Sequence, residues 1–346
     1  MSCFTNDQAD MQKQDRPSPR RRRVLADRSF SKHKAVFLLM SQAPNTQADP
    51  VPETPPLLGP FGLWSRLEAF AFWLFMRLIQ SLGLERATRL SSTLWQWIAP
   101  RLYRHKRAVK HLRMAFPDKS AAECEAIASA MWGHLGATFA ESFHLPQLAR
   151  EPHRYDIHFS PEAKAQIDTH QGLVMVSLHM GNWEINALAA HKVGIRLAGA
   201  YQKVKNPLVD AMIRTMRVPY YPMGLYSKGH EAAKALLKVL RDGETVALMA
   251  DLREGRGLAV PFFGHPAPSN PFPAILARGR KTPLVAACVI RTGAGHYRIE
   301  VEAIPVPVTD NKDQDIAAIT ASIQSCFETM IRAHPDQWMW GHRRWG

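Results

Sequence analysis

The alternation of hydrophobic and polar residues divides the chain into three parts. Residues 1–56 are poor in apolar side chains and rich in basic residues, Pro, Gln, Asp and Thr, which predicts a disordered tail. Residues 57–150 carry apolar stretches with helical spacing, and residues 151–346 alternate short apolar runs with amphipathic stretches. These patterns predict a helical region followed by an α/β domain.

In the α/β part, short continuous apolar runs have the length of buried strands, and the stretches between them have helical periodicity. The expected strands are residues 172–178, 196–201, 244–251, 258–263, 283–290 and 297–304. One helix is expected to begin near residue 184. Four more are expected at residues 206–217, 228–243, 273–280 and 313–334. This order predicts a mixed, largely parallel sheet flanked by helices, with an active site at the carboxyl ends of its strands.

The most hydrophobic stretch of the chain, residues 57–84, is interrupted by Arg66, Glu68, Arg77 and Gln80. It therefore lacks the roughly 20 uninterrupted apolar residues of a simple spanning helix. On a helix Arg66 and Arg77 fall within about 20° of each other, opposite an apolar face. We expect an N-terminal hydrophobic membrane helix that lies in the interface or spans shallowly. A buried core helix of a soluble domain is the alternative.

Basic residues crowd directly after this stretch: Arg101, Arg104, Lys106, Arg107, Lys110 and Arg113. Beside a membrane helix they suit the cytoplasmic face and anionic lipid, whereas a solvated helix face is the plain alternative. A capping box of Ser120 and Glu123 then predicts a helix over residues 121–142.

The formal net charge of +14 predicts attraction to polyanions, which include nucleic acid, anionic lipid and an acidic carrier protein. Nucleic acid is disfavoured, because the basic residues are not interleaved with aromatic residues along one face. The four cysteines have no CxxC spacing, which argues against a zinc site and a disulfide framework and favours a reducing compartment.

The stretch HMGNWE places His179 at the end of the expected strand 172–178 and Glu184 at the start of the next helix. Residues five apart in one helix are rotated by about 140° and do not meet, so the pair makes sense only across a turn. Gly181 and Asn182 supply the residues of such a turn. A metal site would need further ligands at compatible spacing.

Two interpretations of this pair stay open from the spacing alone. In the first, Glu184 orients the imidazole of His179, whose other nitrogen removes a proton from a substrate hydroxyl during acyl transfer. The adjacent helix N-terminus would favour the carboxylate and help to hold an oxyanion. In the second, the histidine is a structural residue at a strand end, bonded to a capping glutamate.

The neighbouring sequence resembles a known family. SLHMGNWE is similar to the HxxxxD/E block of the lysophospholipid acyltransferase superfamily, specifically that of the lipid A biosynthesis late acyltransferases. Further blocks agree in order: residues 105–141, 206–217, 228–251, VPFFGHPAP at 260–268 and QWMWGHRRW at 337–345. The similarity covers residues 57–345.

This resemblance implies a glycerol-3-phosphate acyltransferase-like fold with a catalytic domain at residues 151–346. It implies that His179 is the general base and Glu184 its orienting partner, with no metal and no cofactor. Residues expected to bind substrate are Asn182, Lys203, Arg217, Asp251 and Arg253. The two arginines suit phosphate or a thioester carbonyl, with structural ion pairs as the alternative.

The resemblance also implies the partners and the location. The donor would be acyl carrier protein bearing a fatty acyl chain, and the acceptor a lipid A precursor at the anionic cytoplasmic face of the bacterial inner membrane. Another lipid acceptor is the alternative. The C-terminal Trp340, His342, Arg343, Arg344 and Trp345 suit either a lipid interface or an anchor in the protein core.

Overall fold

A computed structural model describes residues 62–168 and 172–345, so the predicted tail at residues 1–56 lies outside the described residues. The first described elements are all helical, as the spacing of apolar residues predicts. They are α2 (Leu63–Ser81), α3 (Leu84–Ile98), α4 (Tyr103–Ala115), α5 (Ala121–Ser142) and α6 (Leu145–Arg150). The capping box is confirmed, since the Glu123 backbone N–H donates to Ser120 Oγ and Ser120 N–H to the Glu123 carboxylate.

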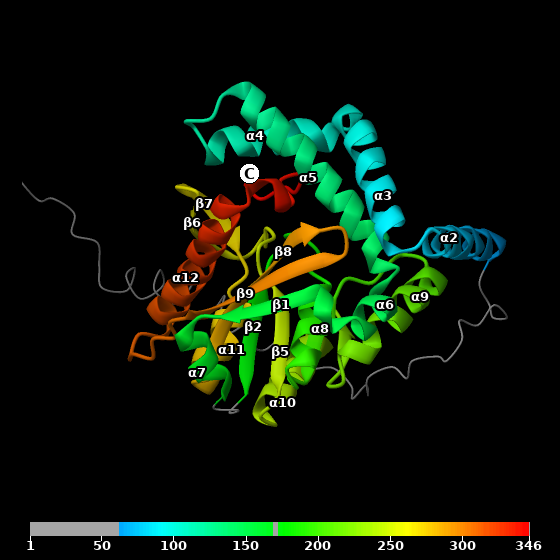
Figure 1. Cartoon of the computed structure of the whole chain (residues 1–346). Helices are drawn as coiled ribbons and strands as arrows, with labels where there is room; N and C mark the ends of the chain where they lie inside the picture. The colour runs from blue at the N-terminus through cyan, green and yellow to red at the C-terminus, as the bar shows by residue number, and fades with distance from the viewer. Residues whose placement is uncertain (1–61, 169–171, 346) are drawn as a thin grey trace, which may run out of the picture. The chain divides into compact units, whose positions relative to one another are not determined.

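A seven-stranded sheet forms the centre of the part of the chain that the structure describes (Figure 1). Its strand order is β1-β9-β8-β2-β5-β3-β4, and only the β8–β9 pair is antiparallel. The prediction of a mixed, largely parallel sheet is therefore confirmed. Its strands are β1 (Tyr155–Phe159), β2 (Leu173–Ser177), β3 (Leu197–Tyr201), β4 (Leu225–Ser227), β5 (Thr245–Met249), β8 (Leu284–Gly293) and β9 (His296–Ile304).

Helices cover both faces of this sheet because its central strands are apolar on both sides. In β2, Val174 and Val176 point into one core with α10 (His230–Arg241), α11 (Phe272–Arg280) and α12 (Lys312–Ala333), whereas Leu173 and Met175 face the other. That second core includes α7 (Pro161–Asp168) and α8 (Ile185–Lys192).

One predicted sheet strand lies elsewhere. The run at residues 258–263 forms β6 (Leu258–Phe262), which pairs with β7 (His265–Ser269) in a separate antiparallel hairpin. Pro266 and Pro268 lack the N–H groups that an interior strand must donate, which suits β7 to this edge position.

The hydrophobic helix α2 is shorter than the stretch 57–84 expected to form it. It packs against α9 (Pro207–Arg217), but Ala69 is its single buried residue, so the alternative of a buried core helix is wrong. Gly83, with φ +71°, separates α2 from α3. Among the described residues no single helix has both the length and the apolar character to cross a membrane; the pair 63–81 and 84–101 meets these two criteria together but is bent by 117°.

Candidate active site

His179 lies in the turn between β2 and α8, as predicted. The strand β2 ends at Ser177 in the middle of the sheet, and α8 begins at Ile185 with Glu184 as its N-cap residue. Gly181 has φ +54°, and a Cβ there would lie 2.1 Å from the carbonyl oxygen of Val289, so the turn requires glycine. The turn therefore holds the imidazole at the carboxyl end of the strand.

The carboxylate that meets His179 belongs to Asp251. The Nδ1–H of His179 donates to Asp251 Oδ1 at 2.8 Å, and the His179 backbone N–H donates to Oδ2 at 2.8 Å. The indole N–H of Trp338 also donates to Oδ2, at 2.9 Å. The parallel register explains this meeting: Ser177 of β2 is level with Met249 of β5, so the residues two positions beyond each strand lie side by side.

Asp251 is fully buried and ionised. Burial alone would raise its pKa, but the charge and hydrogen bonds of His179, with the Trp338 hydrogen bond, outweigh burial and lower the pKa to about 2. An ionised partner accepts the proton on Nδ1, which leaves the lone pair of the histidine on Nε2. This is the tautomer that a general base requires.

The Nε2 atom of His179 has no protein hydrogen-bond partner among residues 62–168 and 172–345, and the side chain is 16% exposed. The rings of Trp183 and His342 lie beside the imidazole, with centroid separations of 5.0 and 5.7 Å. A substrate hydroxyl that reaches Nε2 would thus meet a nitrogen with a free lone pair, held in one orientation.

Glu184 differs from its predicted role as the partner of His179. Its carboxylate accepts two hydrogen bonds from Arg217, one from Nε at 2.9 Å and one from Nη2. The physical reason is that Glu184 opens α8 beside the C-terminal end of α9, where the planar guanidinium offers a matched pair of donors. The histidine and the glutamate of the HxxxxE motif thus belong to two different ion pairs, His179–Asp251 and Glu184–Arg217.

The other residues predicted to bind substrate fall into two groups. Lys203 follows β3 and Arg253 follows β5; both are exposed and have no ion-pair partner among the described residues. Asn182, by contrast, is fully buried and does not face solvent. Its side-chain NH₂ donates to Glu141 at 3.0 Å, and its Oδ1 accepts from the Glu184 backbone at 3.2 Å, so it stabilises the turn.

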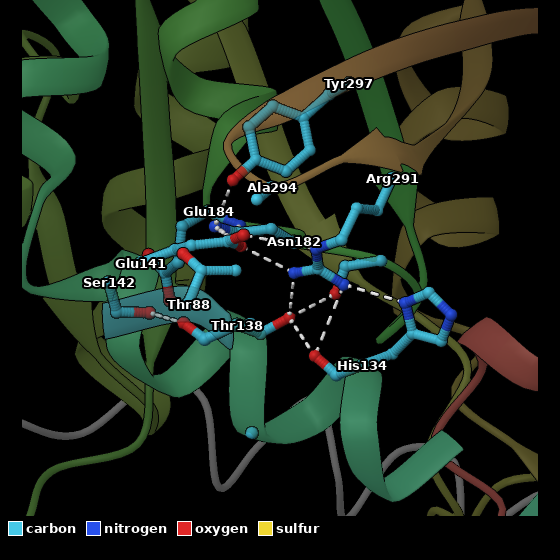
Figure 2. A network of polar contacts seen from close by, with 12 residues as sticks. Thr88, His134, Thr138, Glu141, Ser142, Asn182, Glu184, Arg291, Ala294 and Tyr297 are labelled. Atoms are coloured by element: carbon cyan, nitrogen blue, oxygen red, sulfur yellow. Dashed lines mark hydrogen bonds and ion pairs between the residues drawn. The ribbon is translucent and has the colours of Figure 1, made fainter. Parts of the chain in front are cut away.

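Sequence reasoning missed a buried ion pair behind this turn (Figure 2). Arg291 of β8 donates from Nε and Nη2 to Glu141 of α5, and both side chains are buried. The same guanidinium donates to Thr138 Oγ1 at 2.8 Å, and Thr138 in turn donates to the Gly181 carbonyl at 2.6 Å. The available sequence signal is Arg291, the one charged residue of the otherwise apolar strand β8.

The C-terminal segment forms a wall of the site. Met180 and Trp338 form an antiparallel bridge, the Met339 N–H donates to the His179 carbonyl at 3.1 Å, and Trp338 and Trp340 are fully buried. Arg344 is also fully buried. Of the two predicted roles for this segment, the anchor in the protein core is therefore the one that the structure shows for these residues.

Two other kinds of chemistry can be checked in the described residues: metal binding by grouped side chains and nucleophilic attack by a thiol. Within residues 62–168 and 172–345, no three His, Cys, Asp or Glu side chains are grouped so that they hold a metal ion. Cys288 and Cys326 are free, and burial raises the pKa of each thiol to about 12. These thiols stay protonated at neutral pH and are poor nucleophiles.

A family model, that of the bacterial lipid A biosynthesis acyltransferases, matches residues 63–346. No curated protein matches the chain. The matched range contains every residue of the site described above, together with the whole of the sheet. The chain belongs to the bacterial lipid A biosynthesis acyltransferase family.

Proposed function

We propose that this protein transfers a fatty acyl chain from the thioester of acyl carrier protein to a hydroxyl of a lipid A precursor, with His179 as general base and Asp251 as its orienting carboxylate. Acyl transfer in lipid A biosynthesis follows from the family. The observation that supports the mechanism is the His179 imidazole, bound by Asp251 at Nδ1 and unpartnered at Nε2 among the described residues.

The reaction needs no nucleophile from the protein. His179 Nε2 removes the proton of the acceptor hydroxyl as its oxygen forms a bond to the thioester carbon. The carbonyl becomes an oxyanion, the C–S bond then breaks, and the leaving thiolate takes the proton from His179 Nε2. Asp251, whose pKa is about 2, stays ionised throughout and stabilises the imidazolium.

In the proposed function Arg217 supplies positive charge beside the start of α8, where it is bound to Glu184. Glu184 binds one edge of its guanidinium, while Nη1 has no protein partner within residues 62–168 and 172–345. A guanidinium fixed in this way is oriented for a phosphate or for the thioester carbonyl. The exposed Lys203 and Arg253 add positive charge for a phosphorylated acceptor.

Replacing Arg217 by Lys is expected to lower kcat/KM for a phosphorylated acceptor by about 10–100-fold, because the point charge stays but the paired donors are lost. Steady-state kinetics with varied acceptor concentration measures this. Arg196→Lys is the matched control, since it changes an exposed arginine bound to Glu244 at 2.8 Å and should leave kcat/KM unchanged. Equal kinetics for the Arg217 variant and the native protein would remove Arg217 from the proposed role.

The cytoplasmic face of the inner membrane is the proposed location. Exposed apolar residues on α2 and α3 support it: Leu63, Trp64, Leu67, Phe70, Trp73, Leu74, Phe75, Leu78, Leu90, Leu94 and Trp97. Exposed apolar side chains of this kind suit insertion into the lipid interface. Exposed basic residues lie on α4 and directly before it, and their charge suits binding to anionic lipid and to an acidic carrier protein. They are Arg101, Arg104, Lys106, Lys110 and Arg113.

Mass spectrometry of lipid A from cells with and without this protein tests the proposed function. We expect the cells that lack it to lose one acyl chain from their lipid A. An unchanged acyl pattern would contradict the lipid A acceptor and favour the alternative of another lipid. Purified protein offered a phosphorylated glucosamine disaccharide bearing Kdo, and a lysophospholipid in parallel, separates these two acceptors.

A further inference from the structure

The C-terminal segment brings a second histidine to the reaction centre. The Gly181 N–H donates to the Gln337 carbonyl at 3.1 Å, and the Met339 N–H donates to the His179 carbonyl at 3.1 Å. These backbone bonds fix the terminal segment against the His179 turn. As a result His342 lies beside His179, with ring centroids 5.7 Å apart and the rings inclined by 55°.

The imidazole of His342 has a polar atom that the described part of the protein leaves unused. Its Nε2 is buried and has no hydrogen-bond partner there. Buried polar atoms are nearly always paired, so an unpaired one beside a catalytic centre points to a partner that arrives with the substrate. The residues that flank His342 are anchored: Trp340 is fully buried, and Arg344 donates to Ser269 Oγ at 2.7 Å.

His342 is neutral at neutral pH. Burial, with the positive charges of His179, Arg104 and Arg107, outweighs the attraction of Asp251 and lowers the pKa of His342 to about 4. A neutral imidazole with its proton on Nε2 donates a hydrogen bond without repelling the imidazolium that forms on His179. Neutral donors of this kind stabilise oxyanions where water is excluded.

We propose that His342 is a second catalytic residue, whose Nε2–H donates a hydrogen bond to the thioester carbonyl oxygen as this oxygen becomes an oxyanion. This inference rests on the proposed function. The hydroxyl proton moves to His179 Nε2, the new C–O bond forms, and His342 binds the resulting negative charge. When the C–S bond breaks the carbonyl is restored, the thiolate takes the proton from His179, and His342 keeps its own.

Two variants of His342 test this proposal in the full-length protein, with acyl carrier protein thioester as donor and the Kdo-bearing acceptor. His342→Phe keeps a planar ring but removes the donor, and should lower kcat by about 100–1,000-fold with KM values within about threefold of the native ones. His342→Gln restores an N–H donor and should recover at least about tenfold of the lost kcat. The control is His153→Phe, at an exposed histidine, which should leave kcat unchanged.

Each other outcome overturns the proposal. A His342→Phe variant with kcat within about threefold of the native value shows that no essential hydrogen bond was lost. Equal losses in both variants, with lowered thermal unfolding midpoints, show that the residue is structural. If the native protein transfers no acyl chain, this result contradicts both the proposed function and the role of His342. If the native protein and the His342→Phe variant are both active, the result contradicts the role of His342 alone.

Discussion

Replacing Asp251 by Asn is expected to lower kcat by about 1,000–10,000-fold while the protein stays folded. The carboxylate at this position accepts three hydrogen bonds: from the His179 ring and backbone, and from Trp338. An amide has only one oxygen. Its best position is that of Oδ2, where two donors converge, so that the NH₂ group faces Nδ1 of His179.

In that arrangement the amide of the Asp251→Asn variant donates to Nδ1, and the proton of the imidazole moves to Nε2. The nitrogen that faces the substrate then has no lone pair with which to remove a proton. Steady-state kinetics measures the loss of kcat, and ¹⁵N NMR of labelled histidine measures the change of tautomer. Both changes are required, because a lower kcat alone would also follow from a misplaced ring.

Glu125→Gln is the matched control for Asp251→Asn. Glu125 is an exposed carboxylate that pairs with Nε2 of His105, so this substitution makes the same chemical change to a carboxylate–histidine pair on another element. Its kcat should equal that of the native protein. An Asp251→Asn variant with native kcat, or with Nδ1 of His179 still protonated, would contradict the role given to Asp251.

Replacing Arg291 by Met is expected to lower the free energy of unfolding by about 3–5 kcal/mol, because Glu141 is then buried without a partner. The loss should reach the active site as well. Glu141 accepts from Asn182, and Thr138 connects Arg291 to the Gly181 carbonyl, so the His179 turn would lose its support. Urea denaturation measures the change in stability, and kcat reports the position of the turn.

Two further variants separate charge from packing in this pair. Arg291→Lys keeps a positive charge with fewer donors, and should be destabilised less than Arg291→Met. Combining Arg291→Met with Glu141→Leu removes both charges, and should recover at least half of the lost free energy. An Arg291→Met variant within about 1 kcal/mol of the native stability would show that the buried pair does not hold this region.

Much of the fold can be predicted from residue patterns, because its central elements follow strong local rules. The run GLVMVSL is apolar at every position but one and forms β2 between two neighbours, and the capping box begins α5 at the expected residue. The short strands β1 and β4 were not predicted from the sequence. β1 is only five residues long and lies at the sheet edge, where Tyr155 is its single buried residue, so tertiary pairing with β9 determines it.

The candidate site was only partly predictable, because its contacts depend on register and not on spacing. His179 could be placed at a strand tip from its own segment, but its meeting with Asp251 needs the β2–β5 pairing, which joins residues 72 apart in sequence. Glu184 is near in sequence, yet its partner comes from α9. The separation of Glu141 from Arg291 is larger still, at 150 residues, and no local pattern connects them.

The central claim is that His179 is the base of acyl transfer to a lipid A precursor. Mass spectrometry of the acceptor tests it most directly, with purified native protein and His179→Ala, a carrier-protein thioester as donor and a Kdo-bearing phosphorylated glucosamine disaccharide as acceptor. The native protein should add one acyl chain, and His179→Ala, with an unchanged circular dichroism spectrum, should be slower by at least about a thousandfold. An acceptor that gains no acyl chain from the native protein, or gains it equally fast from His179→Ala, would contradict the claim.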